Sequence, residues 1–124
     1  MIDKISNKTQ EHKVYFEIKS KPGILVSTTQ AYWNVITHIK HPTLKGKQNE
    51  VKEVLADPDE MRISKRDRAV LLFYRKFEKR YLCVVVRFLK KRGFIITAYW
   101  TENIGSFNLS VGLPEGQGGR MSGL

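Results

Sequence analysis

The stretch AVLLFYRKFEKRYLCVVVRFLKKRGFIITAYWT, residues 69–101, decides the fold of this chain. It is rich in β-branched and aromatic residues, and two short charged segments, Glu78-Lys79 and Lys90–Gly93, divide it into three. Such segments separated by short turns are typical of consecutive antiparallel strands. We therefore expect strands at Ala69–Phe77, Arg80–Leu89 and Phe94–Trp100, with a short leading strand at Met61–Ser64. Because Leu82–Val86 is apolar on both faces, the middle strand should be central.

The residues before the strands predict a hairpin and two helices. Lys13–Ile18 and Ile24–Ser27 read as two strands joined by a turn at Lys21-Pro22-Gly23. Thr28 or Thr29 could cap a first helix, which Pro42 ends, and a second helix should run from Gln48 to Ala56. The apolar stripe of the first helix, at spacing i, i+3, i+4 and i+7, is Tyr32, Val35, Ile36 and Ile39. The predicted fold is α+β, an N-terminal hairpin and two helices packed on a four-stranded antiparallel sheet.

Length and composition fit one domain. The 124 residues predict a domain at 13–103, a flexible N-terminus at 1–12 and a Gly-rich flexible tail at 104–124. The single cysteine, Cys83, excludes an intrachain disulfide and fits an inert buried thiol. Met1–Gln10 lacks the apolar run of a secretory leader, and the longest apolar runs are strand-sized. We therefore expect a cytoplasmic protein without a membrane span.

The charge predicts an anionic partner. Lys and Arg number 22 and Asp and Glu 12, so the net charge is 22 − 12 = +10. A positive field attracts nucleic acids, anionic membranes and acidic proteins alike, so charge alone does not choose among them. The sequence contains no phosphate-binding glycine loop, no dinucleotide fingerprint and no convincing His or Cys metal set, so we expect neither metal nor cofactor.

Two histidines are the candidate proton-transfer groups. Asn34, His38 and His41 fall at i, i+4 and i+7, opposite the apolar stripe, and both histidines should lie in the last helical turn. There the helix dipole favours the protonated imidazole, and imidazole is the usual proton-transfer group near neutral pH. The alternative, that they only cap helix carbonyls, stays open.

Polar side chains on the strands could contact a phosphate. Arg62 and Ser64 share one face of the leading strand, and Thr97, Tyr99 and Thr101 share one face of the last. The alternative is that Thr and Tyr simply favour strands. Tyr74 and Arg75 point to opposite faces, so only one of them can meet a given site directly.

Taken together, several segments resemble one nuclease family. They are His41-Pro42-Thr43-Leu44, Val51–Leu55 with Asp57-Pro58-Asp59, Ser64, Leu72-Phe73-Tyr74-Arg75, Leu82–Val86 and Phe94–Thr101. This ordered set resembles the barnase, EndoU, colicin and RelE-like nucleases of phage and bacterial toxin–antitoxin loci. The resemblance implies helices on a four-stranded antiparallel sheet and metal-independent cleavage of RNA. It carries functional roles to His41, Ser64, Tyr74, Arg75, Thr97, Tyr99 and Thr101, and matches His38 and Arg62 less closely.

The functional hypothesis is an endoribonuclease toxin that cleaves RNA, such as tRNA or mRNA, to a 2′,3′-cyclic phosphate. The expected catalytic residues are His38, His41, Arg75 and Tyr99. The expected phosphate- or RNA-binding residues are Arg62, Ser64, Lys65, Tyr74, Thr97 and Thr101. An acidic antitoxin is the expected protein partner. The alternatives are a non-catalytic RNA- or DNA-binding module, a basic partner for an acidic protein and, ranked last, a metal-dependent DNA nuclease.

Overall fold

The computed structural model describes residues 13–104 and 109–110 of the chain. The flexibility expected of residues 1–12 and of most of the 104–124 tail lies outside these residues. The strands are β1 Val14–Lys19, β2 Leu25–Thr29, β3 Glu60–Ile63, β4 Val70–Phe77, β5 Arg80–Leu89, β6 Arg92–Thr101 and β7 Leu109–Ser110. The helical elements are α2 Gln30–Val35, the π-helical turn η1 Ile36–Lys40, the 3₁₀ turn η2 Pro42–Leu44 and α3 Gln48–Ala56.

The α+β class is confirmed, but the sheet is larger than the four antiparallel strands expected. Its order is β1-β2-β6-β5-β4-β3-β7, and β3 to β6 form the predicted antiparallel meander with β5 inside it. The N-terminal hairpin joins the same sheet, because Leu25–Ser27 of β2 pair in parallel with Arg92–Phe94 of β6. The sheet is therefore mixed. A hairpin signal is local, and it does not reveal which distant strand edge the hairpin will meet.

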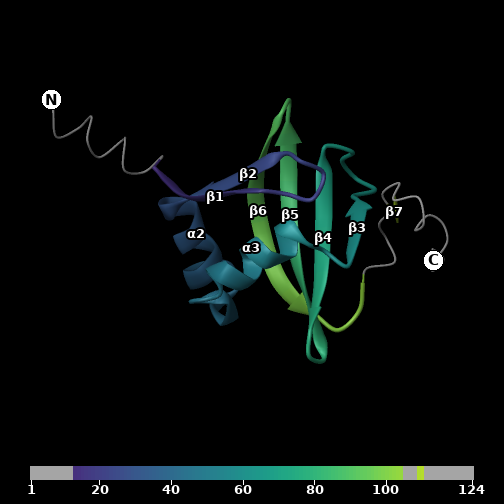
Figure 1. Ribbon diagram of the computed structural model, residues 1–124. Helices are drawn as coiled ribbons and strands as arrows, with labels where there is room; N and C mark the ends of the chain where they lie inside the picture. The colour runs from purple at the N-terminus through teal and green to yellow at the C-terminus, as the bar shows by residue number, and fades with distance from the viewer. Residues whose placement is uncertain (1–12, 105–108, 111–124) are drawn as a thin grey trace, which may run out of the picture.

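The helices cover one face of this sheet. In Figure 1, β3 to β6 run side by side, the β1–β2 hairpin crosses their direction, and α3 lies in front of them. The backbone N–H of Lys21 donates to the carbonyl of Leu55 over 2.9 Å, which fixes the hairpin turn to the end of α3. Val51, Val54 and Leu55 of α3 are buried, as predicted, in the core between the layers.

The first helix differs from its predicted form. Of the two candidates, Thr28 and Thr29, the structure selects Thr29 as the N-cap, and its hydroxyl accepts from the backbone N–H of Tyr32 over 3.0 Å. The helix then widens into the π turn, and Ile39 of the expected stripe is 74% exposed. Within the π turn Thr37 is buried instead, beside Ile36, and Trp33 is already buried in α2 before the turn begins. A π turn holds more residues than an α turn, so it rotates the following side chains away from their expected face.

The opposite face of the sheet carries a second, smaller cluster. Leu72, Tyr74 and Cys83 are its buried members, and Val70, Tyr81, Val85, Tyr99 and Ile104 pack against it. We call this side, which carries Arg62, Tyr74, Cys83, Thr97 and Tyr99, the distal face. Ile104, which follows β6, covers part of the distal face, and β7 extends the sheet beyond β3.

Candidate functional site

Strand register brings several predicted site residues onto the distal face. One row across the sheet is Glu60, Tyr74, Cys83 and Tyr99, and the next is Arg62, Leu72, Val85 and Thr97. Thr101 pairs with Tyr81 in the row on the other side of Tyr99. Side chains at such paired positions lie beside one another. The period-two pattern of the sequence therefore predicted the shared face of the last-strand hydroxyls.

His41 reaches this face at the open edge of β6. β2 pairs only with Arg92–Phe94, so among the described residues the rest of β6 has no strand neighbour on that side, and η1 lies against it instead. Lys40 of η1 places its Nζ 3.5 Å from the carbonyl oxygen of Ile96. His41, the residue that ends η1, lies with its ring 5.9 Å from the ring of Tyr99, measured between centroids. The structure thus joins an imidazole from the helical layer to a phenol on the distal face.

Tyr99 stays protonated at neutral pH. Its pKa is raised, mainly by burial and further by interactions with Cys83 and Tyr74. Burial also raises the pKa of the Cys83 thiol from 9.0 to about 12, against the opposing effect of hydrogen bonds with Tyr99 and Tyr74. Cys83 and Tyr99 therefore keep their protons, and they lie beside the buried Tyr74 on the distal face. A protonated phenol can position a neighbouring imidazole or donate a hydrogen bond.

His38, the other predicted catalytic histidine, lies elsewhere. It is exposed within η1, and its Nδ1 lies 3.0 Å from the carbonyl oxygen of Asn34 and 3.3 Å from the hydroxyl of Thr37. This is the carbonyl-capping arrangement that the sequence left open as an alternative. His38 lies inside the π turn, whereas His41 follows it with a non-helical backbone. The two histidines therefore do not share the one helix face that the sequence predicted for them.

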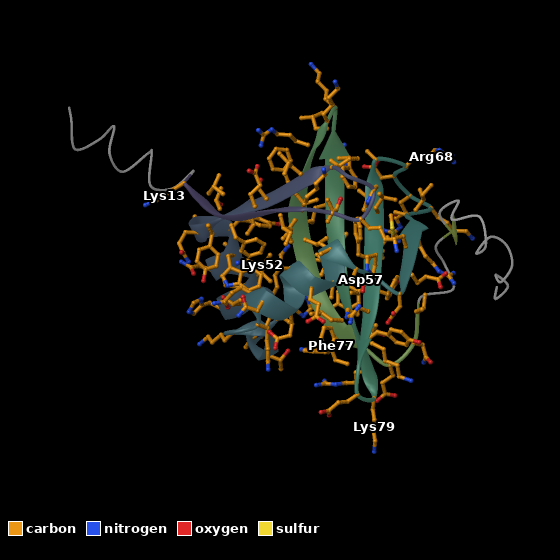
Figure 2. All side chains as sticks on the ribbon, in the orientation of Figure 1. Lys13, Lys52, Asp57, Arg68, Phe77 and Lys79 are labelled. Carbon is orange, nitrogen blue, oxygen red and sulfur yellow. The ribbon has the colours of Figure 1, made fainter. Side chains whose placement is uncertain are left out.

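Arg75, also predicted to be catalytic, lies on the helix-covered face. Its guanidinium contacts Glu53 at 3.2 Å and Asp57 at 3.1 Å, and it donates to the carbonyl of Asp57 over 2.6 Å. Figure 2 labels Asp57 on the side of the sheet where α3 packs. Arg75 therefore fastens the end of α3 to β4 and does not meet Tyr99.

The remaining predicted residues divide between the distal face and its loops. Arg62 is buried there and forms an ion pair of 2.9 Å with Glu60, so its charge is matched locally. The hydroxyl of Thr97 is buried without a hydrogen-bond partner. Ser64 and Thr101 use their hydroxyls within their own turns, toward Arg66 and Asn103, whereas Lys65 is exposed.

One end of the sheet gathers positive charge. The exposed side chains are Lys65, Arg66 and Arg68 of the β3–β4 loop, Arg87 of β5, and Lys90, Lys91 and Arg92 at the β5–β6 turn. We call this set the basic end, and Figure 2 labels Arg68 there, opposite the end that carries Lys79. Asp67 forms an ion pair with Arg87, and its pKa is lowered by hydrogen bonds from the Ala69 backbone and from Arg87. Glu17 pairs with Arg92 at 2.8 Å, and most of the other cations face solvent.

Comparison with protein-family models, with curated proteins and with solved structures finds no match for this chain. Within residues 13–104 and 109–110, no group of three or more His, Cys, Asp or Glu side chains is placed to hold a metal ion. In that same part of the chain, no helix is long and apolar enough to cross a membrane.

Proposed function

We propose that this protein binds RNA and cleaves it without a metal ion, with His41 as the proton-transfer residue. The observation that carries the proposal is the contact between the His41 and Tyr99 rings at the open edge of β6. His41 is half-buried, so its imidazole is held by the protein and still open to a substrate. The net charge of +10 supports a polyanionic substrate.

In the proposed reaction, His41 accepts the proton of a ribose 2′-hydroxyl while the 2′-oxygen attacks the adjacent phosphorus. The bond from phosphorus to the 5′-oxygen breaks, and the leaving oxygen takes a proton from solvent. The products are a 2′,3′-cyclic phosphate and a 5′-hydroxyl. Tyr99, protonated and packed on the imidazole ring, positions His41 for this transfer.

The test is incubation of the purified protein with total RNA and tRNA in EDTA, followed by analysis of the fragment ends. We expect fragments that end in a cyclic phosphate. His41→Ala should lower the cleavage rate by about 10²- to 10⁴-fold, the usual contribution of a positioned proton-transfer group. His38→Ala is the matched control, because it removes an exposed imidazole of the same helical segment and should leave the rate nearly unchanged.

Cleavage that survives His41→Ala at the wild-type rate would show that His41 is not the proton-transfer residue. If His38→Ala, and not His41→Ala, abolishes cleavage, the roles of the two histidines are reversed. RNA left intact by the wild-type protein would contradict the cleavage proposal as a whole.

A second candidate function is binding of RNA without cleavage, and the basic end favours it. The cations of the basic end are exposed and clustered, as expected of a surface that follows a phosphate backbone. Intact RNA together with salt-sensitive binding would support this function. The family resemblance further supports a toxin role, for which an acidic antitoxin covering these cations is the proposed partner.

A further inference from the structure

A pocket opens where β2 leaves β6. The two strands pair only as far as Ser27 and Phe94, and β2 then turns into α2 at Thr29. Between the diverging elements lies a largely apolar pocket of about 330 Å³. The residues that line it include Ser27, Thr29, Tyr32, Arg87, Phe94 and Ile96. None of the site residues predicted from the sequence lines it.

An exposed aromatic ring forms part of the pocket wall. Phe94 is 45% exposed although it stands in the ten-residue strand β6. Directly after it, β6 contains a bulge: Ile95 pairs with Val86 and Thr97 with Val85, so Ile96 is the extra residue. A bulge bends its strand and re-aims neighbouring side chains, and bulges are common beside binding sites. The geometry leaves a flat apolar surface open to a ligand.

Cations lie on both sides of this surface. Arg87 stands opposite Phe94 in the β5–β6 ladder and belongs to the basic end; its side chain is exposed although its guanidinium also pairs with Asp67. On the other side, the ammonium group of Lys40 lies 3.2 Å from the hydroxyl of Tyr32 and 5.4 Å from the centre of its ring. An apolar slot flanked by positive charge matches a nucleotide, whose base is flat and whose phosphates are anionic.

We propose that this pocket binds one unpaired nucleobase of RNA, stacked on Phe94, with the flanking phosphates near Arg87 and Lys40. The inference rests on the proposed RNA-binding function and deepens it by adding a base subsite beside the cleavage site. Lys40 precedes His41 in the chain, and Tyr99 follows Ile96 by three residues, about 10 Å along β6. A base in the pocket would thus hold a neighbouring phosphate within reach of His41.

The test measures binding of an uncleavable single-stranded probe at low salt. The probe is a 2′-O-methyl hexanucleotide, compared with an abasic oligomer of the same length and charge. Stacking on one aromatic ring should make the wild-type protein bind the base-containing probe about tenfold more tightly. Phe94→Ala should remove most of this difference, whereas Phe94→Trp should keep it. Leu89→Ala is the control, because it removes an apolar side chain that is 62% exposed and lies outside the pocket.

Equal affinity of the wild-type protein for the two probes, or no affinity for either, would overturn the base subsite. A preference for bases that Phe94→Ala leaves unchanged would overturn it too, and the pocket would then better suit an apolar side chain of a protein partner. Because the probe lacks a free 2′-hydroxyl, the result does not depend on cleavage. Base-dependent binding that is abolished in Phe94→Ala would support the subsite even if natural RNA stays intact.

Discussion

At the scale of single residues, the distal face shows how burial controls protonation. Cys83 and Tyr99 are neighbours in the β5–β6 ladder, and burial raises the pKa of both groups. A thiol held in its neutral form is a weak nucleophile, so Cys83 is best understood as a packing residue beneath the site. The same neutral surroundings keep the Tyr99 phenol protonated beside His41.

This burial predicts how stability depends on alkaline pH. Above pH 9.0 the thiol ionises in the unfolded chain, whereas in the folded protein it keeps its proton up to a pKa of about 12. The folded state then binds more protons than the unfolded state, so the free energy of unfolding falls as pH rises through this range. Urea denaturation at pH 8 to 11 should show a shallower decline for Cys83→Ala than for the wild type. Parallel declines would contradict the prediction.

At the scale of elements, the path from β2 through α2 and η1 positions His41. Thr29 begins α2 at the point where β2 leaves the sheet, and η1 then carries the chain along the edge of β6. The π turn directs Thr37 into the core and leaves His38 exposed. The π turn η1, and not the identity of either residue, therefore places the two histidines in different surroundings.

The Thr29 cap should contribute measurably to stability. Its hydroxyl accepts from the Tyr32 N–H, and Thr29→Ala should lower the free energy of unfolding by about 1 kcal/mol, the usual value of such a cap. Thr43→Ala is the matched control, because Thr43 is exposed in η2 and should change stability by less than about 0.5 kcal/mol. Equal losses in the two variants, measured by thermal denaturation, would show that the cap contributes nothing specific.

At the scale of the whole molecule, the basic end and the His41–Tyr99 contact lie in different regions of the sheet. β6 begins at the basic end with Arg92, and Tyr99, which contacts His41, stands near its other end. An RNA strand that contacts both regions would lie along β6, past Phe94. Substitutions at the basic end should therefore change the affinity for RNA, whereas substitutions at His41 should change the rate of cleavage.

The basic end should dominate the salt dependence of RNA binding. Lys90→Gln with Lys91→Gln should reduce the slope of log K against log salt by roughly 0.7 for each phosphate that the protein no longer neutralises. Lys45→Gln with Lys79→Gln removes the same charge from exposed positions outside the basic end and should leave the slope close to that of the wild type. Filter binding at several salt concentrations distinguishes the two, and an equal reduction in both variants would indicate a diffuse electrostatic contribution.

The sequence by itself determined the four-strand antiparallel meander, a threonine cap at Thr28 or Thr29, and the common face of Thr97, Tyr99 and Thr101. These features depend on local signals, namely side-chain alternation, turn residues and capping chemistry, which act within a few positions of the chain.

Only the tertiary structure decided which candidates meet. It joined β2 to β6 in parallel, turned Arg75 toward α3, and brought His41 rather than His38 to Tyr99. Alternation shows that Tyr74 and Arg75 face opposite ways, but it does not show which face the helices will cover. Long-range pairing and the π turn depend on contacts between segments far apart in the chain, and no local pattern encodes those contacts.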